Sequence, residues 1–340
     1  MNLKELSRRL GLSQTTVSRA LNGYSDVGEE TRRRVEEAAR ALDYRPSSTA
    51  RRLALGRTGT IGILFPFVGG LSIDPHFAEF LSGVAERVAE TDSDVSIIPT
   101  RAQPGRELMR PSRLRSVDAV IISGPALDDE RMAALQRARV PFVVHGRLRA
   151  DEGYAFLDID NEGAFRRATE LLLDLGHRRI ALLNGDIALA FASRRKEGWE
   201  AALAARGLAA DPRLHREGTM SEEHGHAWTA ALLAAEPRPT ALLCSSMILA
   251  LGCCRALREA GLAIGRDVSV IAHDDGMPFI KPQTMNPALT TTSSSIRLAG
   301  ARIAEIALAL ADGGDPQGFR EVWPAEITFR DSAGPAPEGA

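Results

Sequence analysis

Polar side chains that could do chemistry gather where apolar, strand-like runs of the sequence end, or just inside the helix that follows. They are Arg147, Arg195, Ser245, Ser246, His273, Asp274 and Asp275. A guanidinium that faces a carboxylate across a cleft can hold the donors and acceptors of a polyhydroxyl compound. Phe77 or Phe191 could cover the apolar face of such a compound. The histidine and aspartates could instead carry out acid–base chemistry on a carbohydrate.

Each candidate also has an ordinary structural interpretation. Arg147 could pair with an acidic surface group, and Arg195 could form an ion pair at a helix end. Asp274 could stabilise a turn, and we expect Asp275 to be structural. The two phenylalanines could belong to the hydrophobic core. Only their positions in the fold can separate these interpretations.

The scaffold that positions these side chains begins at Thr60, where short apolar runs alternate with segments of helical spacing. A first series has strands at 61–65, 95–98, 119–122 and 142–144 and helices at 77–89 and 130–138. After 156–158, a second has strands at 180–183, 240–243 and 268–272 and helices at 161–175, 193–205 and 247–260. We therefore predict an α/β body of two doubly wound parallel-sheet lobes. Ligands bind such sheets at the carboxyl ends of the strands.

The first 45 residues have a different pattern, that of a small all-α head. Its expected helices are 3–10, 14–21 and 29–42. Gly11 ends the first helix, and Ser13 has the position of the N-cap of the second. So short a turn is typical of a helix-turn-helix, whose second helix enters the DNA major groove. Its outward-facing Gln14, Thr15 and Arg19 could bind base edges, or could form a solvated polar face.

The net charge of −2 conceals an uneven distribution along the 340 residues. Residues 1–60 hold 12 Lys and Arg against 7 Asp and Glu, whereas the remainder holds 30 against 37. A basic head on an acidic body suggests that the head alone meets a polyanion, because phosphates attract cationic side chains.

Specific motifs in the head strengthen this interpretation. They are Leu12-Ser13-Gln14-Thr15-Thr16-Val17-Ser18-Arg19-Ala20-Leu21-Asn22, Thr31-Arg32-Arg33-Arg34-Val35 and Leu42-Asp43-Tyr44-Arg45-Pro46. With them the chain resembles the lactose-repressor (LacI/GalR) family of bacterial transcription regulators. The resemblance implies DNA contacts from Ser13, Gln14, Thr15, Thr16, Ser18, Arg19, Asn22, Tyr44, Ala50 and Leu53.

The same resemblance gives a role to the segment after the head. It implies that residues 46–54 form a hinge helix on the operator, where Leu53 is inserted between base pairs in the minor groove. An apolar wedge unstacks a base step, and the contacts to the bent DNA offset the cost. Alternatively, Leu53 is an ordinary apolar residue of a linker.

The resemblance continues through the body. Its motifs are Asp158-Ile159-Asp160-Asn161, Leu175-Gly176-His177-Arg178-Arg179-Ile180-Ala181, Ala250-Leu251-Gly252 and Ala288-Leu289-Thr290-Thr291. They imply a periplasmic-binding-protein fold used as a sensor, with effector contacts from Arg195, Asp274 and an aromatic at Phe77. The full set of predicted effector-binding residues is Phe77, Arg147, Phe191, Arg195, Ser246 and Asp274.

Two details bear on the effector. The Asn-Asp pair common in the family before Ala-Leu-Gly is replaced by Ser246-Met247, which changes one ligand contact. The segments 145–147 (His-Gly-Arg) and 273–275 (His-Asp-Asp) are similar to those of an α-glucoside-responsive branch.

These observations predict the domain organisation. We expect a DNA-binding domain at 1–45, a hinge and linker at 46–58, and an effector-binding and dimerisation domain at 59–330. The expected N-lobe comprises 59–158 and 294–317, and the expected C-lobe 159–293 and 318–330. Residues 331–340 have the composition of a disordered tail.

The sequence predicts neither a cofactor nor a metal site. Cys244, Cys253 and Cys254 lie in one apolar segment without metal-ligand spacing, so we expect buried thiols. No apolar run is long enough for a membrane span and no export signal is present, which predicts a cytoplasmic protein without a membrane partner.

The leading hypothesis is a sequence-specific, homodimeric repressor of carbohydrate-utilisation genes. It would bind a palindromic operator in double-stranded DNA and respond to a small sugar in the cleft between the lobes. A ligand-dependent activator remains an alternative. An enzyme using His273, Asp274 and Asp275 lacks a supporting catalytic motif. A transport binding protein would leave the basic head unexplained.

Overall fold

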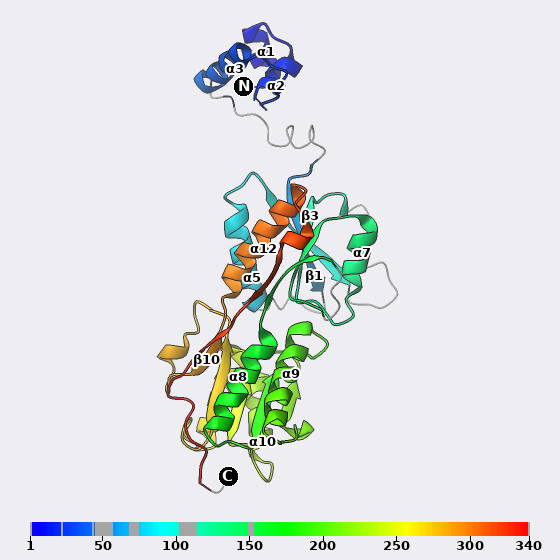
Figure 1. The fold of residues 1–340 in the computed structure, drawn as a ribbon. Helices are drawn as coiled ribbons and strands as arrows, with labels where there is room; N and C mark the ends of the chain where they lie inside the picture. Colours follow the sequence, from blue (N-terminus) through cyan, green and yellow to red (C-terminus); the bar gives the residue numbers. More distant parts are fainter. Residues whose placement is uncertain are drawn as a thin grey trace.

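The computed structural model describes residues 2–21, 23–42, 44, 57–67, 75–101, 114–148 and 153–338. It confirms the predicted fold class of a helical head followed by two α/β lobes with parallel sheets (Figure 1). Among these residues, no helix has the length and apolar character needed to span a membrane.

The head consists of α1 (Leu3–Leu10), α2 (Gln14–Leu21) and α3 (Glu29–Ala41). Gly11 has a φ of 68°, a left-handed conformation that glycine adopts without steric cost, and its N–H bonds to carbonyls of the last turn of α1. The Ser13 hydroxyl accepts a hydrogen bond of 3.0 Å from the Thr16 N–H and so caps α2. Leu6, Val17 and Val35, one from each helix, form the centre of a small core.

The N-lobe is built on a sheet of parallel strands in the order β11-β5-β4-β3-β1-β2. The strands are β1 (Thr60–Phe67), β2 (Asp94–Arg101), β3 (Ala119–Ser123), β4 (Phe142–His145), β5 (Ala155–Ile159) and β11 (Arg320–Trp323). Ile61, Ile121 and Val143 face one side, while Val120 and Val144 face the other. Both faces are covered, which explains why these strands are apolar runs without a polar face.

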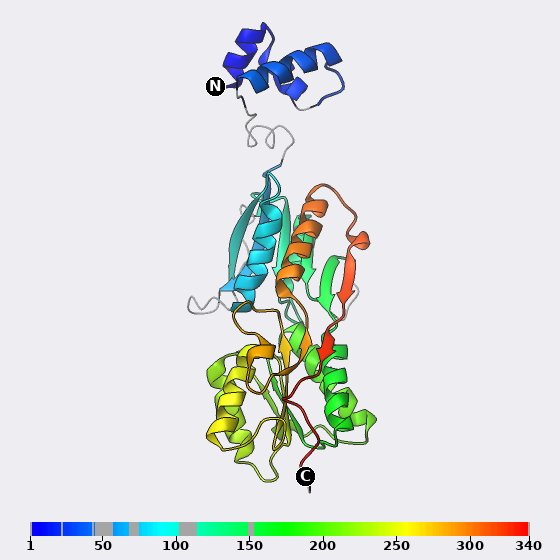
Figure 2. The ribbon, with the colours of Figure 1, turned by 90° about the vertical axis from the view of Figure 1, so that its left-hand side faces the viewer.

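Helices cover the two faces of the N-lobe sheet. Helices α5 (Pro75–Val88) and α12 (Ile296–Ala311) lie side by side on one face (Figure 2), and α7 (Glu130–Ala138) covers the other. A Cβ atom at Gly83 of α5 would lie 1.9 Å from the Arg297 carbonyl oxygen, and one at Gly300 of α12 would lie 2.2 Å from that of Phe80. Only glycine therefore permits this close approach of the two helices.

The C-lobe repeats the architecture with a sheet in the order β12-β10-β9-β8-β6-β7. Its strands are β6 (Ile180–Asn184), β7 (His215–Glu217), β8 (Ala241–Cys244), β9 (Ser269–Asp274), β10 (Thr290–Ser293) and the antiparallel β12 (Glu326–Thr328). Its helices are α8 (Asn161–Asp174), α9 (Ala190–Ala205), α10 (Glu222–Leu233) and α11 (Met247–Glu259). Short 3-10 helices lie at Pro212–Leu214, Pro282–Thr284 and Pro316–Gly318.

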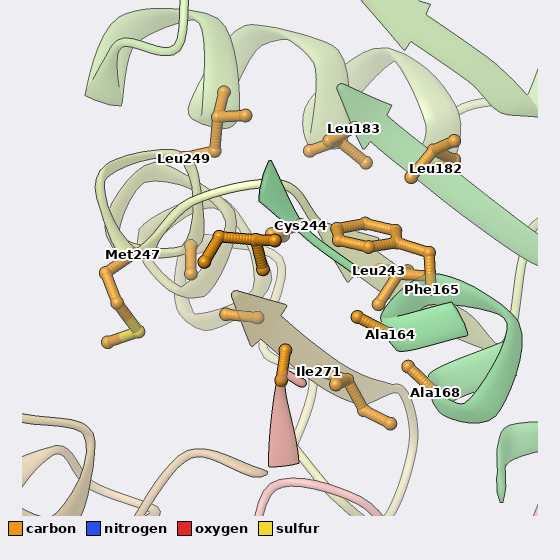
Figure 3. Close-up of a cluster of buried hydrophobic side chains, with 14 of the residues drawn as sticks. Ala164, Phe165, Ala168, Leu182, Leu183, Leu243, Cys244, Met247, Leu249 and Ile271 are labelled. Atoms are coloured by element: carbon orange, nitrogen blue, oxygen red, sulfur yellow. The ribbon is translucent and has the colours of Figure 1, made fainter. Parts of the chain in front are cut away.

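The core of the C-lobe lies between its sheet and the flanking helices. Figure 3 shows side chains from α8, β6, β8, β9 and α11 packed together, among them Phe165, Leu182 and Ile271. Cys244 belongs to this cluster, and Cys253 and Cys254 of α11 are buried in the same core. The prediction of buried thiols is confirmed.

The chain passes between the lobes after β5, between β10 and α12, and between β11 and β12. The predicted lobe boundary at 318 is therefore wrong for Arg320–Trp323, since β11 pairs with β5 in the N-lobe sheet. A strand of only four residues carries no sequence signal of which sheet it joins. The predicted hinge helix lies outside the described residues.

The predicted disordered tail is wrong for residues 331–338. The Ser332 hydroxyl is fully buried, donates 2.6 Å to the Val270 carbonyl and accepts 2.8 Å from the Thr290 N–H. The Gly334 N–H donates 3.0 Å to the Ser269 hydroxyl, and the Ala336 N–H donates to Leu175. A composition of small residues and proline is a sequence signal of disorder, but these hydrogen bonds attach the segment to the C-lobe.

Candidate effector and DNA-binding sites

A cavity of about 350 Å³ lies between the two lobes, where the strands end. This is the size of a small-molecule site. Aromatic and aliphatic side chains form most of its wall, including Phe65, Phe77, Phe80 and Phe191. The ionisable side chains that line it are His76, His145, Asp158, Arg195, His273 and Asp275.

Arg195 of α9 is the cation of the cavity. Its Nε donates 2.8 Å to the Asn161 side-chain oxygen, and Nη1 donates to the Ser245 carbonyl. The guanidinium lies 5.0 Å from the ring centres of both Phe165 and Phe191. Burial lowers the pKa of Arg195 to about 10, while nearby carboxylates oppose that shift. The group therefore stays charged at neutral pH and is held rigidly.

Asp275 directly follows β9 and connects the lobes. One carboxylate oxygen is 3.1 Å from His76 Nε2 of the N-lobe helix α5, and the other is 3.4 Å from His273 Nε2. Although burial opposes ionisation of Asp275, the two histidines hold its pKa well below the usual range. Burial lowers the pKa of His273, whose Nδ1 is 2.9 Å from the Thr292 hydroxyl. Asp275 is thus an ionised group already engaged with protein partners.

Asp158, the penultimate residue of β5, is the second carboxylate of the cavity. It is 3% exposed, and burial raises its pKa to about 6, against the opposing effects of Arg147 and Arg194. The nearest cation is Arg147, with its Nε 3.4 Å from Asp158 Oδ2. Asp158 lies on the N-lobe wall, and Asp275 on the C-lobe wall.

One rim of the cavity is closed by backbone hydrogen bonds between the lobes. The Leu127 N–H donates 2.9 Å to the Ala188 carbonyl, and the Ala190 N–H donates 3.0 Å to the Pro125 carbonyl. Pro125 and Leu189 of these two loops also line the cavity. The lobes are therefore in direct contact beside the site, so a change in their relative position would change the cavity.

The structure separates the predicted effector-binding residues into two groups. Phe77, Phe191 and Arg195 line the cavity, whereas Arg147, Ser246 and Asp274 are not among the lining residues. Arg147 instead forms an ion pair with Asp158, which is buried and is not the surface group that the alternative interpretation expected.

The other two residues outside the cavity wall have local partners. The Ser246 hydroxyl caps α11 by accepting 3.2 Å from the Leu249 N–H. The Asp274 carboxylate accepts 2.9 Å from the Gly276 N–H, the turn interaction that was the alternative for this residue. Asp275, expected to be structural, lines the cavity.

Several lining residues were missed by sequence reasoning. Asp158 and Asn161 lie within the Asp158-Ile159-Asp160-Asn161 motif, and their position directly after an apolar run was a usable signal. His145 follows the apolar run of β4 in the same way. His76 carried no such signal, because it reaches the site from the first turn of α5.

The predicted DNA-contacting residues that the structure describes lie on or beside α2. Ser13, Gln14, Thr15 and Arg19 are exposed, while Thr16, Ser18 and Tyr44 are partly buried. The Ser13 and Thr16 side chains are 2.8 Å apart within the helix cap.

Two of these residues have further partners in the head. Arg19 pairs with Asp26 at 2.8 Å, and its guanidinium lies over the Tyr24 ring. Tyr44 packs against the head core, and burial raises its pKa. Asn22, Ala50 and Leu53 lie outside the described residues, and so their predicted contacts stay predictions.

Family models match both parts of the chain. Residues 2–47 match "Bacterial regulatory proteins, lacI family", and residues 169–333 match "Periplasmic binding protein-like domain". The HTH-type transcriptional regulator AglR of Rhizobium meliloti is 47% identical, over 99% of this chain and 96% of its own. RafR of Escherichia coli, also an HTH-type transcriptional regulator, is 32% identical over 95% of this chain and 96% of its own.

Solved structures are similar over nearly the whole length. The Lac repressor dimer bound to operator and the anti-inducer ONPF has a TM-score of 0.78, with 27% identity and 98% of each chain covered. The complex of the transcriptional regulator CelR with cellobiose has a TM-score of 0.69, with 27% identity over 98% of this chain and 99% of that one.

Proposed function

Because the chain belongs to the lacI family of bacterial regulatory proteins and is a DNA-binding transcription regulator, we propose that it is a cytoplasmic, homodimeric repressor of carbohydrate-utilisation genes. A single head reads one half-site, so two heads related by a two-fold axis match a palindromic operator. The exposed face of α2, with Gln14, Thr15 and Arg19, enters the major groove.

The effector is a small sugar that binds in the cavity between the lobes. The observation that carries this proposal is that a guanidinium, Arg195, and the carboxylate of Asp275 both line a cavity whose wall includes the aromatic rings of Phe77 and Phe191. Sugars need hydrogen-bonding groups around their rim and an apolar surface for their C–H face. An α-glucoside agrees with the His-Gly-Arg and His-Asp-Asp segments, which are similar to those of an α-glucoside-responsive branch of the family. Arg195 and Asp275 hold the ligand and perform no catalytic step.

Binding of the sugar is coupled to DNA binding through the lobes. A ligand that contacts both walls favours one relative position of the lobes and so changes the spacing of the hinge segments in the dimer. We propose that the sugar-bound position separates them and releases the operator.

The test uses the full-length protein and a palindromic DNA fragment selected from random duplexes. Mono- and disaccharides are first screened by thermal shift, since a ligand at 100 times its Kd adds about 2.7 kcal/mol of stability. A sugar that binds is expected to weaken DNA binding about 5- to 150-fold in fluorescence anisotropy. DNA affinity unchanged at saturating concentrations of every sugar that binds would refute the coupling.

The hinge is tested with Leu53→Ala. Loss of the apolar wedge is expected to weaken operator affinity, since an unstacked base step would no longer be filled, while sugar affinity stays at the wild-type value. Unchanged operator affinity would remove the wedge role from Leu53 and leave the major-groove contacts intact.

A further inference from the structure

The N-lobe wall of the cavity contains a carboxylate that protein groups do not fully satisfy. Asp158 has a side chain only 4% exposed, and among the described residues its Oδ2 atom has no hydrogen-bond partner. Arg147 Nε lies 3.4 Å away, close enough for an ion pair but without hydrogen-bond geometry. A buried acceptor without a donor is costly, so a donor supplied by a ligand would stabilise it.

The charges around the cavity indicate what kind of donor fits. Two carboxylates, Asp158 and Asp275, and one guanidinium, Arg195, line the wall. Arg195 is partly committed, through Nε to Asn161 and through Nη1 to the Ser245 carbonyl. Arg147 and Arg194 also act on Asp158, but neither lines the cavity, and Arg147 is already paired with this carboxylate. At the cavity wall, a ligand anion would therefore meet two like charges and one cation already in use, whereas a neutral hydroxyl could donate to Asp158 without repulsion.

We propose that Asp158 is a specificity-determining residue of the effector site: its carboxylate accepts a hydrogen bond from a hydroxyl of a neutral sugar and disfavours anionic sugars. The proposal rests on the proposed function, because it concerns the same cavity. It adds a second point of recognition, on the wall opposite Asp275, so the ligand is selected for hydroxyl donors at both ends and for the absence of charge.

The test compares wild-type protein with Asp158→Asn by calorimetric titration. The ligands are maltose, sucrose, trehalose and methyl α-glucoside, each beside the uronic acid made by oxidation of one primary hydroxyl. Asp160→Asn is the matched control. Asp160 is two residues further on, caps α8 by accepting from the Gly163 N–H, and does not line the cavity; asparagine retains this capping ability.

We expect wild-type protein to bind a neutral sugar more tightly than its uronic acid. Asp158→Asn should weaken binding of the neutral sugar at least about tenfold, because a charge-assisted hydrogen bond is lost. In the same variant, the ratio of the affinity for the neutral sugar to the affinity for its uronic acid should become smaller. A merely structural role of Asp158 would not change this ratio. Asp160→Asn should alter neither value.

The outcomes separate the two proposals. If a neutral sugar binds and Asp158→Asn has the wild-type affinity and preference, the role of Asp158 is refuted and the sugar-responsive function stands. If no neutral sugar binds the wild type, both are refuted. Asp158→Ser repeats the comparison if the asparagine variant does not fold. Equal wild-type affinity for a sugar and its uronic acid would overturn the proposal without any variant.

Discussion

The two walls of the cavity contain the same kind of residue in opposite electrostatic situations. Asp275 on the C-lobe wall and Asp158 on the N-lobe wall are both removed from solvent. Two histidines hold the pKa of Asp275 well below its usual range, whereas burial raises that of Asp158 to about 6. Burial disfavours the charge of both, so the difference lies in the partners that each carboxylate has.

This difference indicates that the two carboxylates have different roles. Asp275 has two roles: its contact with His76 connects the C-lobe to α5 of the N-lobe, and its carboxylate also lines the cavity. The Asp158 carboxylate has fewer hydrogen-bond partners in the protein, so a hydrogen bond from a ligand would stabilise it more. Arg195 of α9 also lines the cavity, and both carboxylates act on its charge.

The largest expected effect follows from removing that shared cation. Arg195→Ala deprives the Asn161 side chain and the Ser245 carbonyl of their donors, and removes the guanidinium whose charge both carboxylates stabilise. We expect effector affinity to fall at least about 100-fold by calorimetry, since removing one charged partner of a buried binding contact costs about 2–5 kcal/mol of binding free energy. Lys196→Ala, on the same helix but paired with Glu200 outside the cavity, is the control. Undiminished sugar affinity would show that the cavity is not the effector site.

A smaller effect is expected at Asp275. Asp275→Asn weakens the contact with His76 and His273 and should lower effector affinity about tenfold and the free energy of unfolding by about 1–3 kcal/mol. Asp274→Asn is the matched variant, since asparagine can also accept from the Gly276 N–H. It should change effector affinity less than about twofold. The reverse order of the two effects would favour the original sequence assignment of Asp274.

This pair of residues also shows how far sequence reasoning extends to the site. The pattern of apolar runs predicted β9 and placed His273, Asp274 and Asp275 at its carboxyl end. Which of the adjacent aspartates faces the cavity depends on how the chain leaves the strand. In the turn at Gly276, which has a φ of 76°, the Asp274 carboxylate accepts a hydrogen bond from the Gly276 N–H. Hydrophobic periodicity does not predict this turn geometry.

The fold was more predictable than the site for a similar reason. The elements α8 and β3 bury apolar side chains in the core. The spacing of these side chains along the sequence predicts a helix or a strand directly. Short elements lack such a signal: β11 pairs with β5 only because the chain crosses back to the N-lobe. His76 was missed because its contact with Asp275 depends on how two lobes distant in sequence meet.

The third prediction concerns pH and separates the two carboxylates without a mutation. The charged groups facing Asp158 are the guanidinium groups of Arg147, Arg194 and Arg195, while burial lowers the pKa of His145 on the same wall to about 4. Effector affinity should therefore fall up to about tenfold per unit as the pH drops below about 6, because protonated Asp158 accepts poorly. The dependence should be absent in Asp158→Asn; a flat wild-type profile from pH 7 to 5 would contradict it.

The raised pKa of Asp158 also predicts that the ligand-free protein becomes more stable, relative to Asp158→Asn, as the pH falls. The folded pKa of Asp158 exceeds its ordinary value of 3.8, so between these values the folded state binds more protons than the unfolded state. Relative to Asp158→Asn, the wild-type free energy of unfolding should rise by up to about 3 kcal/mol as the pH falls from about 6 toward 4. Urea denaturation of both variants measures the difference. A relative loss of stability on acidification would mean that Asp158 resembles Asp275, and the contrast between the walls would disappear.

The smallest expected effect tests the partner of Asp158. Arg147→Met keeps an apolar stem near the Phe156 ring but removes the cation that lowers the pKa of Asp158. That pKa should rise further above its ordinary value, so a larger fraction of Asp158 is protonated at pH 7 and effector affinity falls only a few-fold. The loss should be recovered at pH 8.5, where Asp158 is ionised again, and the midpoint of the affinity profile should lie at higher pH than in the wild type. If the loss of affinity instead persists at pH 8.5, Arg147 contacts the ligand itself, as the sequence alone predicted. The comparison of the two walls must then include a second cation that binds the ligand.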